Sequence, residues 1–143
     1  MEFHQDGYTI STDKERLDID RIQEFLSEVS YWAKGRNRQT TEKAVQNSLC
    51  FGVYDPDGNQ VGFARLVTDY ATFAWLCDVF ILEQYRGRGL GKWLIETITS
   101  LPELADRCIF VLKTQNAHEL YRRYGGFTNL SIPQKWMERL RRA

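Results

Sequence analysis

Residues 84–92 read QYRGRGLGK, and this stretch separates an apolar run from a segment with helical periodicity. The run before it, residues 78–82, reads DVFIL, and its branched and aromatic side chains predict a strand. After the stretch, apolar residues recur every three or four positions until Pro102 ends the pattern, which predicts a helix. The glycines that stand at this passage from strand to helix are Gly87, Gly89 and Gly91.

The composition of this stretch suits an anionic ligand. Glycine tolerates positive φ and lets main-chain amides approach a ligand closely. The first turn of the helix adds unpaired N–H donors and the positive end of the helix dipole. Arg86, Arg88 and Lys92 supply full positive charges. The stretch therefore predicts a site where backbone amides hold a diphosphate.

The spacing of the glycines excludes two common nucleotide-binding motifs. The first glycine of a P-loop would fall on Arg86 and its hydroxyl residue on Trp93, and the third glycine of a dinucleotide fingerprint would fall on Lys92. Residues 84–89 instead fit Gln-x-x-Gly-x-Gly, which resembles the acetyl-CoA signature of the GCN5-related N-acetyltransferase (GNAT) superfamily. A glycine-rich turn with solvated charges is the alternative interpretation.

A second segment, residues 114–127, resembles the other signature of that superfamily, Asn-x-x-Ala-x-x-Leu-Tyr-x-x-x-Gly-Phe. The residues in register are Ala117, Leu120 and Tyr121. Thr114 stands where the pattern has asparagine, with Asn116 two positions later, which leaves open the side chain that would contact the pantetheine arm. One extra glycine displaces Phe127 by one position, and paired glycines readily form a left-handed helix cap.

Periodicity along the chain predicts the element order β-α-α-β-β-β-α-β-α-β. Strands are expected at 8–11, 49–54, 61–68, 72–82, 108–112 and from Leu130 onward, helices at 18–29, 40–48, 90–101 and 116–124, and a short helix or a loose end at 136–142. This order gives a mixed α/β (α+β) fold, in which a mostly antiparallel sheet is flanked by helices. It resembles the acyl-CoA N-acyltransferase fold, and residues 1–143 are interpreted as a single N-acetyltransferase domain.

Composition narrows the classes of protein to consider. Lys plus Arg equals Asp plus Glu, 19 each, so no net basic field favours nucleic acid as a partner. No apolar run reaches the length of a membrane span, and the first residues lack the pattern of a signal peptide. Cys50, Cys77 and Cys108 lie in apolar runs, which predicts buried free thiols in a reducing compartment. We therefore expect a cytoplasmic protein.

The resemblance to the GNAT superfamily implies acetyl-CoA as co-substrate and no metal. In the resembling enzymes the strand before the glycine loop separates from its neighbour, and its backbone holds the pantetheine arm and polarises the thioester carbonyl. The donor-binding residues implied here are Val79, Phe80 and Ile81 on the strand, with Gly87, Arg88, Gly89, Leu90, Gly91 and Lys92 at the pyrophosphate.

Tyr121 falls on the position of the second signature that commonly serves, in the resembling enzymes, as general acid to the departing thiolate. Proton transfer from a phenol of pKa about 10 to a thiolate whose conjugate acid is near 8.5 is uphill by roughly 2 kcal/mol. Either Arg122 or Arg123 lowers the pKa of Tyr121, or the phenol donates a hydrogen bond, which is the role we expect. A tyrosine that only packs on the sheet is the alternative interpretation.

The sequence identifies no general base for the amine. Asp78, inside the apolar strand, is one candidate, although a salt bridge is the favoured interpretation of a lone carboxylate there. His118 is expected to be exposed and His4 to lie in a mobile terminus, and water relays are equally plausible.

Residues 31–36, YWAKGR, are expected to help form the acceptor pocket, as in the resembling enzymes. Aromatic side chains there suit an amine and Lys34 and Arg36 suit a carboxylate, unless the segment is simply a buried helix end.

The leading functional hypothesis is an acetyl-CoA-dependent N-acetyltransferase, in which a primary amine of a small molecule or protein attacks acetyl-CoA directly in a ternary complex. The alternative is a non-catalytic acyl-CoA-binding or regulatory domain, and a nucleic-acid-binding module is a weaker third option. Edge strands could pair in a homodimer. The sequence leaves open the acceptor, the general base and the preferred acyl chain.

Overall fold

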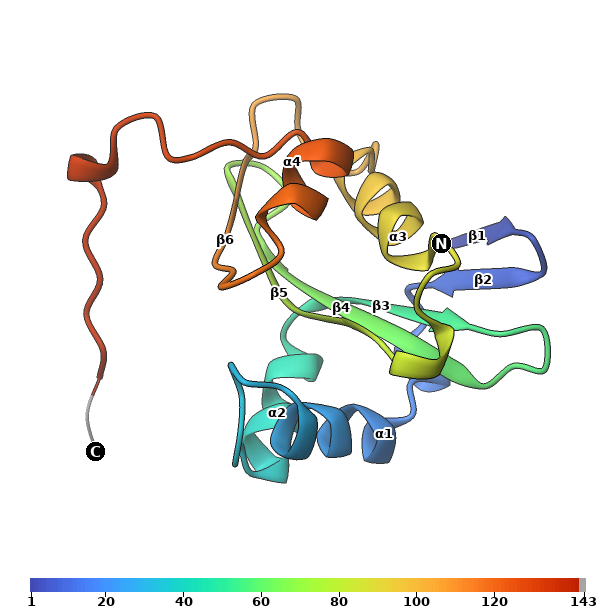
Figure 1. The fold of residues 1–143 in the computed structure, drawn as a ribbon. Helices are drawn as coiled ribbons and strands as arrows, with labels where there is room; N and C mark the ends of the chain where they lie inside the picture. Colours follow the sequence, from blue (N-terminus) through green and yellow to red (C-terminus); the bar gives the residue numbers. More distant parts are fainter. Residues whose placement is uncertain (142–143) are drawn as a thin grey trace.

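A computed structural model describes residues 1–141, which form one six-stranded sheet in the order β1-β2-β3-β4-β5-β6 (Figure 1). The strands are β1 (Glu2–Gln5), β2 (Tyr8–Ser11), β3 (Leu49–Tyr54), β4 (Gln60–Thr68), β5 (Phe73–Ile81) and β6 (Ile109–Leu112). The helices are α1 (Ile19–Glu24), which continues as a π-helical turn (Phe25–Val29), α2 (Arg38–Gln46), α3 (Leu90–Thr99) and α4 (His118–Gly125). Short 3₁₀ turns occur at Lys14–Arg16, Glu83–Tyr85 and Pro133–Lys135.

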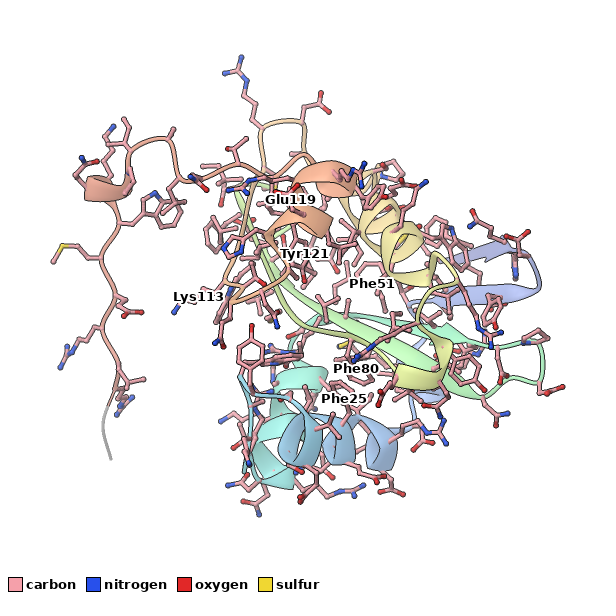
Figure 2. All side chains as sticks on the ribbon, viewed as in Figure 1. Phe25, Phe51, Phe80, Lys113, Glu119 and Tyr121 are labelled. Carbon is pink, nitrogen blue, oxygen red and sulfur yellow. The ribbon has the colours of Figure 1, made fainter. Side chains whose placement is uncertain are left out.

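Two helical layers sandwich the sheet, which confirms the predicted fold class. Helices α3 and α4 cover one face and α1 and α2 cover the other (Figure 1). On the α3 face, Leu94 and Ile95 pack with Phe51 of the sheet in one buried cluster. On the opposite face, Phe25 stacks on Phe80 with ring centroids 4.0 Å apart (Figure 2). Alternate side chains of the central strands β3, β4 and β5 thus serve opposite cores, as the pleat requires.

β5 bends and then loses one of its neighbours. Its pairing with β4 shifts register between Phe63 and Arg65, so that Asp78 and Val79 together oppose one residue of β4. Asp78 has φ 54°, and this β-bulge turns the strand. The parallel pairing of β5 with β6 ends at Leu76 with Leu112. The last five residues of β5, 77–81, therefore have no strand beside them on the β6 side among the described residues.

The two ends of the chain differ from the predicted order. The single strand expected at 8–11 is half of a hairpin, whose Asp6-Gly7 turn has φ 52° and 83°, as a type I′ turn requires. The prediction of a last strand from Leu130 onward is wrong, because in residues 1–141 no strand follows β6. A 3₁₀ turn starts at Pro133, which cannot donate to a sheet, and residues 136–141 are a loose end that stands clear of the sheet (Figure 1). Residue 142 lies outside the described residues.

The helix starts show how local chemistry sets the elements. The Asp18 carboxylate accepts from the Arg21 amide at 3.0 Å, and this is the predicted cap of the first helix. The second helix begins earlier than expected, because Asn37 rather than a threonine caps it by accepting from the Thr40 amide at 2.8 Å. No helix in the described part of the chain has the length and apolar character to cross a bilayer.

Candidate active site

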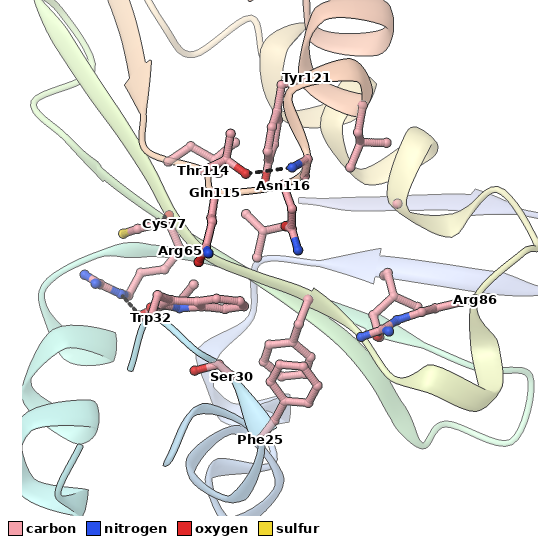
Figure 3. Close-up of a pocket in the computed structure, with 18 of the residues that line it drawn as sticks. Phe25, Ser30, Trp32, Arg65, Cys77, Arg86, Thr114, Gln115, Asn116 and Tyr121 are labelled. Atoms are coloured by element: carbon pink, nitrogen blue, oxygen red, sulfur yellow. Dashed lines mark hydrogen bonds and ion pairs between the residues drawn. The ribbon is translucent and has the colours of Figure 1, made fainter. Parts of the chain in front are cut away.

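A cleft of about 1180 Å³ lies along the separated end of β5. Three segments build its walls: the glycine loop with the start of α3, the residues that follow β6 with the inner face of α4, and residues 29–36 after α1 (Figure 3). The two sequence motifs, far apart in the chain, thus lie on one cavity together with the proposed acceptor segment. The cleft is the candidate site.

The glycine loop presents free main-chain amides to this cleft. Gly87 has φ 81° and Gly89 has φ 77°, a left-handed conformation that favours glycine. The Trp93 amide donates to the Gly89 carbonyl at 3.0 Å, so the amides of the preceding residues of α3 have no partner within the helix. Gly91 is different, since a Cβ there would only touch Ile81 at an ordinary 3.9 Å. Neither backbone strain nor crowding requires glycine at position 91. The remaining reason for a glycine there is that the missing Cβ leaves space for a ligand.

Three cations surround these amides without being neutralised. The Arg88 guanidinium donates to the Tyr8 hydroxyl at 3.2 Å and lies 5.4 Å from the centre of the Tyr85 ring. The Lys92 ammonium lies 5.1 Å from the Tyr124 ring centre, and Arg86 donates to a main-chain carbonyl. Within residues 1–141 none of the three forms an ion pair with a carboxylate. The loop therefore combines unpaired N–H donors, a helix N-terminus and net positive charge, which suits a pyrophosphate.

The end of β5 offers its backbone to the cleft. The Leu82 amide donates to the Val61 carbonyl of β4 at 2.8 Å. Because the hydrogen-bonding direction alternates along a strand, the amides of Ile81 and Val79 face the side from which β6 has departed. Phe80 is buried against Phe25, so only its main chain is available to a ligand.

Asp78 is the centre of a buried ion-pair network. Its carboxylate accepts from Arg36 and from Arg65, both at 2.8 Å, and from the Trp32 indole at 3.0 Å. Burial alone would raise the pKa of Asp78, but the hydrogen bond from Arg36 and the charge and hydrogen bond of Arg65 outweigh it and lower the pKa. The salt-bridge interpretation is therefore confirmed, and a carboxylate of low pKa with three donors is a poor general base.

Tyr121 points from α4 into the cleft and is 9% exposed (Figure 3). Burial raises its pKa to about 12, and the nearby Tyr31 adds to the shift. Arg122 donates to Glu119 at 3.2 Å and to Asn129 at 2.9 Å. The alternative that an arginine lowers the pKa of Tyr121 is wrong. The group is a neutral phenol, which can donate a hydrogen bond.

Thr114, which stands where the second signature has asparagine, has a local structural role. The Thr114 hydroxyl accepts from the Ala117 amide at 3.0 Å and so fixes the turn that precedes α4 (Figure 3). Asn116 also lines the cleft and is exposed.

The acceptor segment is not simply a buried helix end. Tyr31 is 50% exposed and Trp32 is 41% exposed, and both line the cleft. The Tyr31 hydroxyl accepts from the Gln115 amide at 2.9 Å and joins this segment to the loop after β6. Arg36 lines the cleft, whereas Lys34 is exposed elsewhere. Sequence reasoning missed Arg65 and Gln115, although a lone arginine in the apolar strand VGFARLV was a readable signal.

The two histidine candidates lie outside the cleft, whereas Cys77 lines it. His118 is exposed on the outer face of α4, and His4 bonds to Thr9 on the β1–β2 hairpin. Cys50 is buried, as expected, whereas Cys77 and Cys108 are half-buried, and all three are free thiols. Among residues 1–141, no three His, Cys, Asp or Glu side chains gather as a metal site would require.

Comparison with known proteins places this geometry in a family. The profile of the Acetyltransferase (GNAT) domain matches residues 46–125. A Gibberella zeae protein named as an acetyltransferase is 30% identical, and the match covers 87% of this chain and 86% of that protein. A crystal structure assigned to the GNAT family, from Xanthomonas campestris pv. campestris, superposes with a TM-score of 0.88 at 46% identity, over 93% of this chain and 92% of the other. The chain therefore belongs to the GNAT family of acetyltransferases.

Proposed function

We propose that the protein transfers the acetyl group of acetyl-CoA to a primary amine by direct attack in a ternary complex. The observation that carries the proposal is the single cleft, which joins an anion cradle at one end to an aromatic and cationic pocket at the other. The unpaired end of β5 and Tyr121 lie between the two ends. Both substrates would thus meet where the backbone and one phenol can act on a thioester.

The donor end fits coenzyme A through residues that this chain supplies. The amides at residues 87–92 and the cations of Arg88 and Lys92 would hold the pyrophosphate. Gly91 keeps that approach open, because it lacks the Cβ that would stand there. The amides of Val79 and Ile81 would hold the pantetheine arm and polarise the thioester carbonyl oxygen.

The reaction forms a C–N bond and breaks a C–S bond. The amine nitrogen attacks the thioester carbon, the carbonyl oxygen carries the negative charge of the tetrahedral intermediate, and the thiolate leaves with the electron pair of the C–S bond. The Val79 amide would stabilise the oxyanion, and Tyr121 would donate a hydrogen bond to the departing sulfur. Because Asp78 is held as an ion pair, the proton of the amine would leave through water in the open cleft.

The charge of the cleft favours an acceptor that carries an anionic group besides its amine. Its lining includes five cationic side chains, Arg36, Arg65, Arg86, Lys92 and Lys113, but one carboxylate, Asp78, which is already paired. Arg86 and Lys92 belong to the donor end. Arg36 and Arg65 share the one carboxylate of Asp78, so their cluster keeps one excess positive charge, whereas Lys113 is paired with Glu138. The excess charge at Arg36 and Arg65 opposes a polyamine and suits a carboxylate or phosphate.

A thiol-release assay with acetyl-CoA and a panel of amino acids, amino sugars, polyamines and peptides tests the proposal, with mass spectrometry of the acetylated product. We expect stoichiometric thiol release and an acetylated amine. Tight acetyl-CoA binding with only slow hydrolysis across the panel would favour the non-catalytic binding domain instead. Absence of acetyl-CoA binding by calorimetry would refute both.

A further inference from the structure

Two aromatic side chains stand exposed in the cleft beside the ion-pair network of Asp78. Tyr31 is 50% exposed and Trp32 is 41% exposed, and both belong to the wall formed by residues 29–36. Their ring centroids are 5.2 Å apart and their planes meet at 84°, so the two rings form a right-angled pair, here called the aromatic corner. Tryptophan is on average highly buried, and an open aromatic pair in a cleft is typical of a ligand-binding surface.

Hydrogen bonds at their polar atoms fix both rings of the aromatic corner. The Trp32 indole N–H donates to the Asp78 carboxylate at 3.0 Å, and the Tyr31 hydroxyl accepts from the Gln115 amide at 2.9 Å. Trp32 also packs against Phe25, with ring centroids 6.4 Å apart, and its indole lies between Phe25 and the loop that carries Gln115 (Figure 3). A ligand that stacks on these rings need not first order them, which favours binding.

The surroundings of the aromatic corner favour an apolar, planar group over a sugar. Val29 lies two positions before Tyr31 and Cys77 adjoins Asp78, and both line the cleft. Asp78 is the only carboxylate among the described residues of the lining, and it already accepts from three donors. A sugar ring would bring hydroxyl groups that need new hydrogen-bond partners, whereas an aryl group gains by stacking alone.

A carboxylate-binding group lies next to the aromatic corner. Among the described residues, Arg36 donates to Asp78 through Nη1 alone, at 2.8 Å. The other N–H donors of this guanidinium remain for a second carboxylate. Because Asp78 holds both Trp32 and Arg36, a ring at the corner and an anion at Arg36 would be only a few bonds apart in one ligand.

We propose that the aromatic corner binds an aryl group of the acceptor, and that the acceptor is an aromatic amino acid. This inference rests on the proposed function and adds the part of the acceptor that acetyl transfer itself does not specify. An aromatic α-amino acid carries its ring, its carboxylate and its amine within a few bonds. With the ring on Trp32 and the carboxylate on Arg36, the amine would lie near Val79, which follows Asp78 in β5 and whose amide is proposed to hold the thioester.

Three amino acids that differ only in the side chain test the aromatic corner in the thiol-release assay. They are phenylalanine, cyclohexylalanine, which has similar bulk but no π-system, and alanine. We expect kcat/KM to be at least about tenfold higher for phenylalanine than for alanine, with cyclohexylalanine between them. Equal values for phenylalanine and alanine, or a preference for an amino sugar phosphate, would overturn the inference and leave the proposed acetyl transfer intact.

Substitutions separate stacking from a merely structural role of the rings. Trp32→Leu also removes one donor to Asp78, and a purely structural effect would lower kcat/KM for every acceptor by the same factor. Stacking instead predicts that the ratio of kcat/KM for phenylalanine to that for alanine falls at least about tenfold in Trp32→Leu. Tyr31→Leu should also lower this ratio, whereas Tyr31→Phe, which keeps the ring, should preserve it. An unchanged ratio in both leucine variants would contradict the inference.

Phe73→Leu is the matched control, because Phe73 is 38% exposed on β5 but does not line the cleft. It should leave the ratio unchanged, and thermal unfolding should show that all variants are folded. If no amine is acetylated, the proposed function fails, and calorimetry with phenylpropionate, which has the ring and the carboxylate but no amine, decides the aryl site. Saturable binding that Trp32→Leu weakens at least about tenfold would support the aryl site, and absence of binding would overturn it as well.

Discussion

Two buried ionisable side chains, Asp78 and Tyr121, define what the cleft can do. The environment of each fixes one protonation state: two guanidinium groups keep Asp78 ionised, and burial keeps Tyr121 neutral. Neither group is poised to change its charge near neutral pH. The proposed chemistry at this scale therefore relies on hydrogen bonding and a fixed electrostatic field rather than on a side-chain base.

Replacing Tyr121 with phenylalanine isolates the hydroxyl from the packing of the ring. We expect kcat to fall at least about tenfold, because the departing sulfur loses its donor, while the acetyl-CoA dissociation constant stays nearly unchanged. Steady-state kinetics and calorimetry measure the two quantities. An unchanged kcat would assign Tyr121 a packing role.

Asp78→Asn should lower the free energy of unfolding of the protein. The buried Arg65 and the half-buried Arg36 would lose their counter-charge, at a cost of about 3 kcal/mol in the free energy of unfolding measured with urea. Asp20→Asn is the matched control, because Asp20 pairs with Arg38 at the surface and should cost less than about 1 kcal/mol. A large loss of kcat with stability intact would instead make Asp78 a catalytic base.

The rate should rise with pH toward the pKa of the acceptor amine, about 10 for an alkylamine, because the proposed reaction needs the neutral amine and has no side-chain base. Tyr121 adds no falling limb in that range, since it stays protonated until its pKa of about 12. Profiles of kcat/KM for amines of different pKa provide the measurement. A rate plateau near pH 7 that is common to all amines would reveal a base that this proposal lacks.

At the scale of single elements, the three glycines of the loop are required for different physical reasons. Gly87 and Gly89 adopt positive φ, so their requirement is conformational, and the strand and helix on either side follow from the local pattern. Gly91 sits in ordinary helical backbone. Its requirement, if the loop binds pyrophosphate, is the space that it leaves.

Gly91→Ala separates ligand approach from folding. Alanine favours helix and fits beside Ile81 at 3.9 Å, so stability should hold or rise by up to about 1 kcal/mol. The acetyl-CoA dissociation constant should nevertheless rise at least about tenfold, because a methyl group would stand where the pyrophosphate approaches. Thermal unfolding and calorimetry check the pair of outcomes, and unchanged affinity would remove the loop amides from donor binding. Gly58→Ala, at a turn outside the cleft where φ is 85°, is the contrasting control: it should lower stability through backbone strain and leave the acetyl-CoA dissociation constant unchanged.

Short-range patterns were readable from the sequence and long-range ones were not. The loop, the helix after it and the Asp18 cap depend on neighbours along the chain, and all were predicted. The hairpin at Asp6-Gly7 was missed because four-residue strands give little periodicity, although the turn signal was present. The strand expected from Leu130 failed because pairing depends on a partner that local pattern does not specify. The network of Asp78 with Arg36 and Arg65 joins residues 42 and 13 positions apart, beyond the reach of any motif.

At the scale of the whole molecule, the sheet gathers segments from most of the chain around a cleft whose charged side chains are mostly cationic. The formal net charge of the protein is zero, so this local excess is not visible in composition. A pocket whose charged side chains are mostly of one sign attracts or repels a substrate according to its charge before any detailed contact is made.

Matched acceptors test that selection. For an amino acid and its carboxamide, kcat/KM should favour the free carboxylate at least about tenfold, and Arg36→Gln should reduce the preference. Lys34→Gln is the control, because Lys34 does not line the cleft. Equal rates for both acceptors would refute the charge preference while leaving the proposed acetyl transfer intact.

The hydrogen bond between the Gln115 amide and the Tyr31 hydroxyl joins two segments that no strand pairing holds together. One such bond contributes only about 1 kcal/mol, so thermal motion breaks and remakes it many times without disturbing either hydrophobic layer. Deuterium exchange at the Gln115 amide should then follow this brief local parting. Its rate would stay the same in variants whose global stability has been raised or lowered.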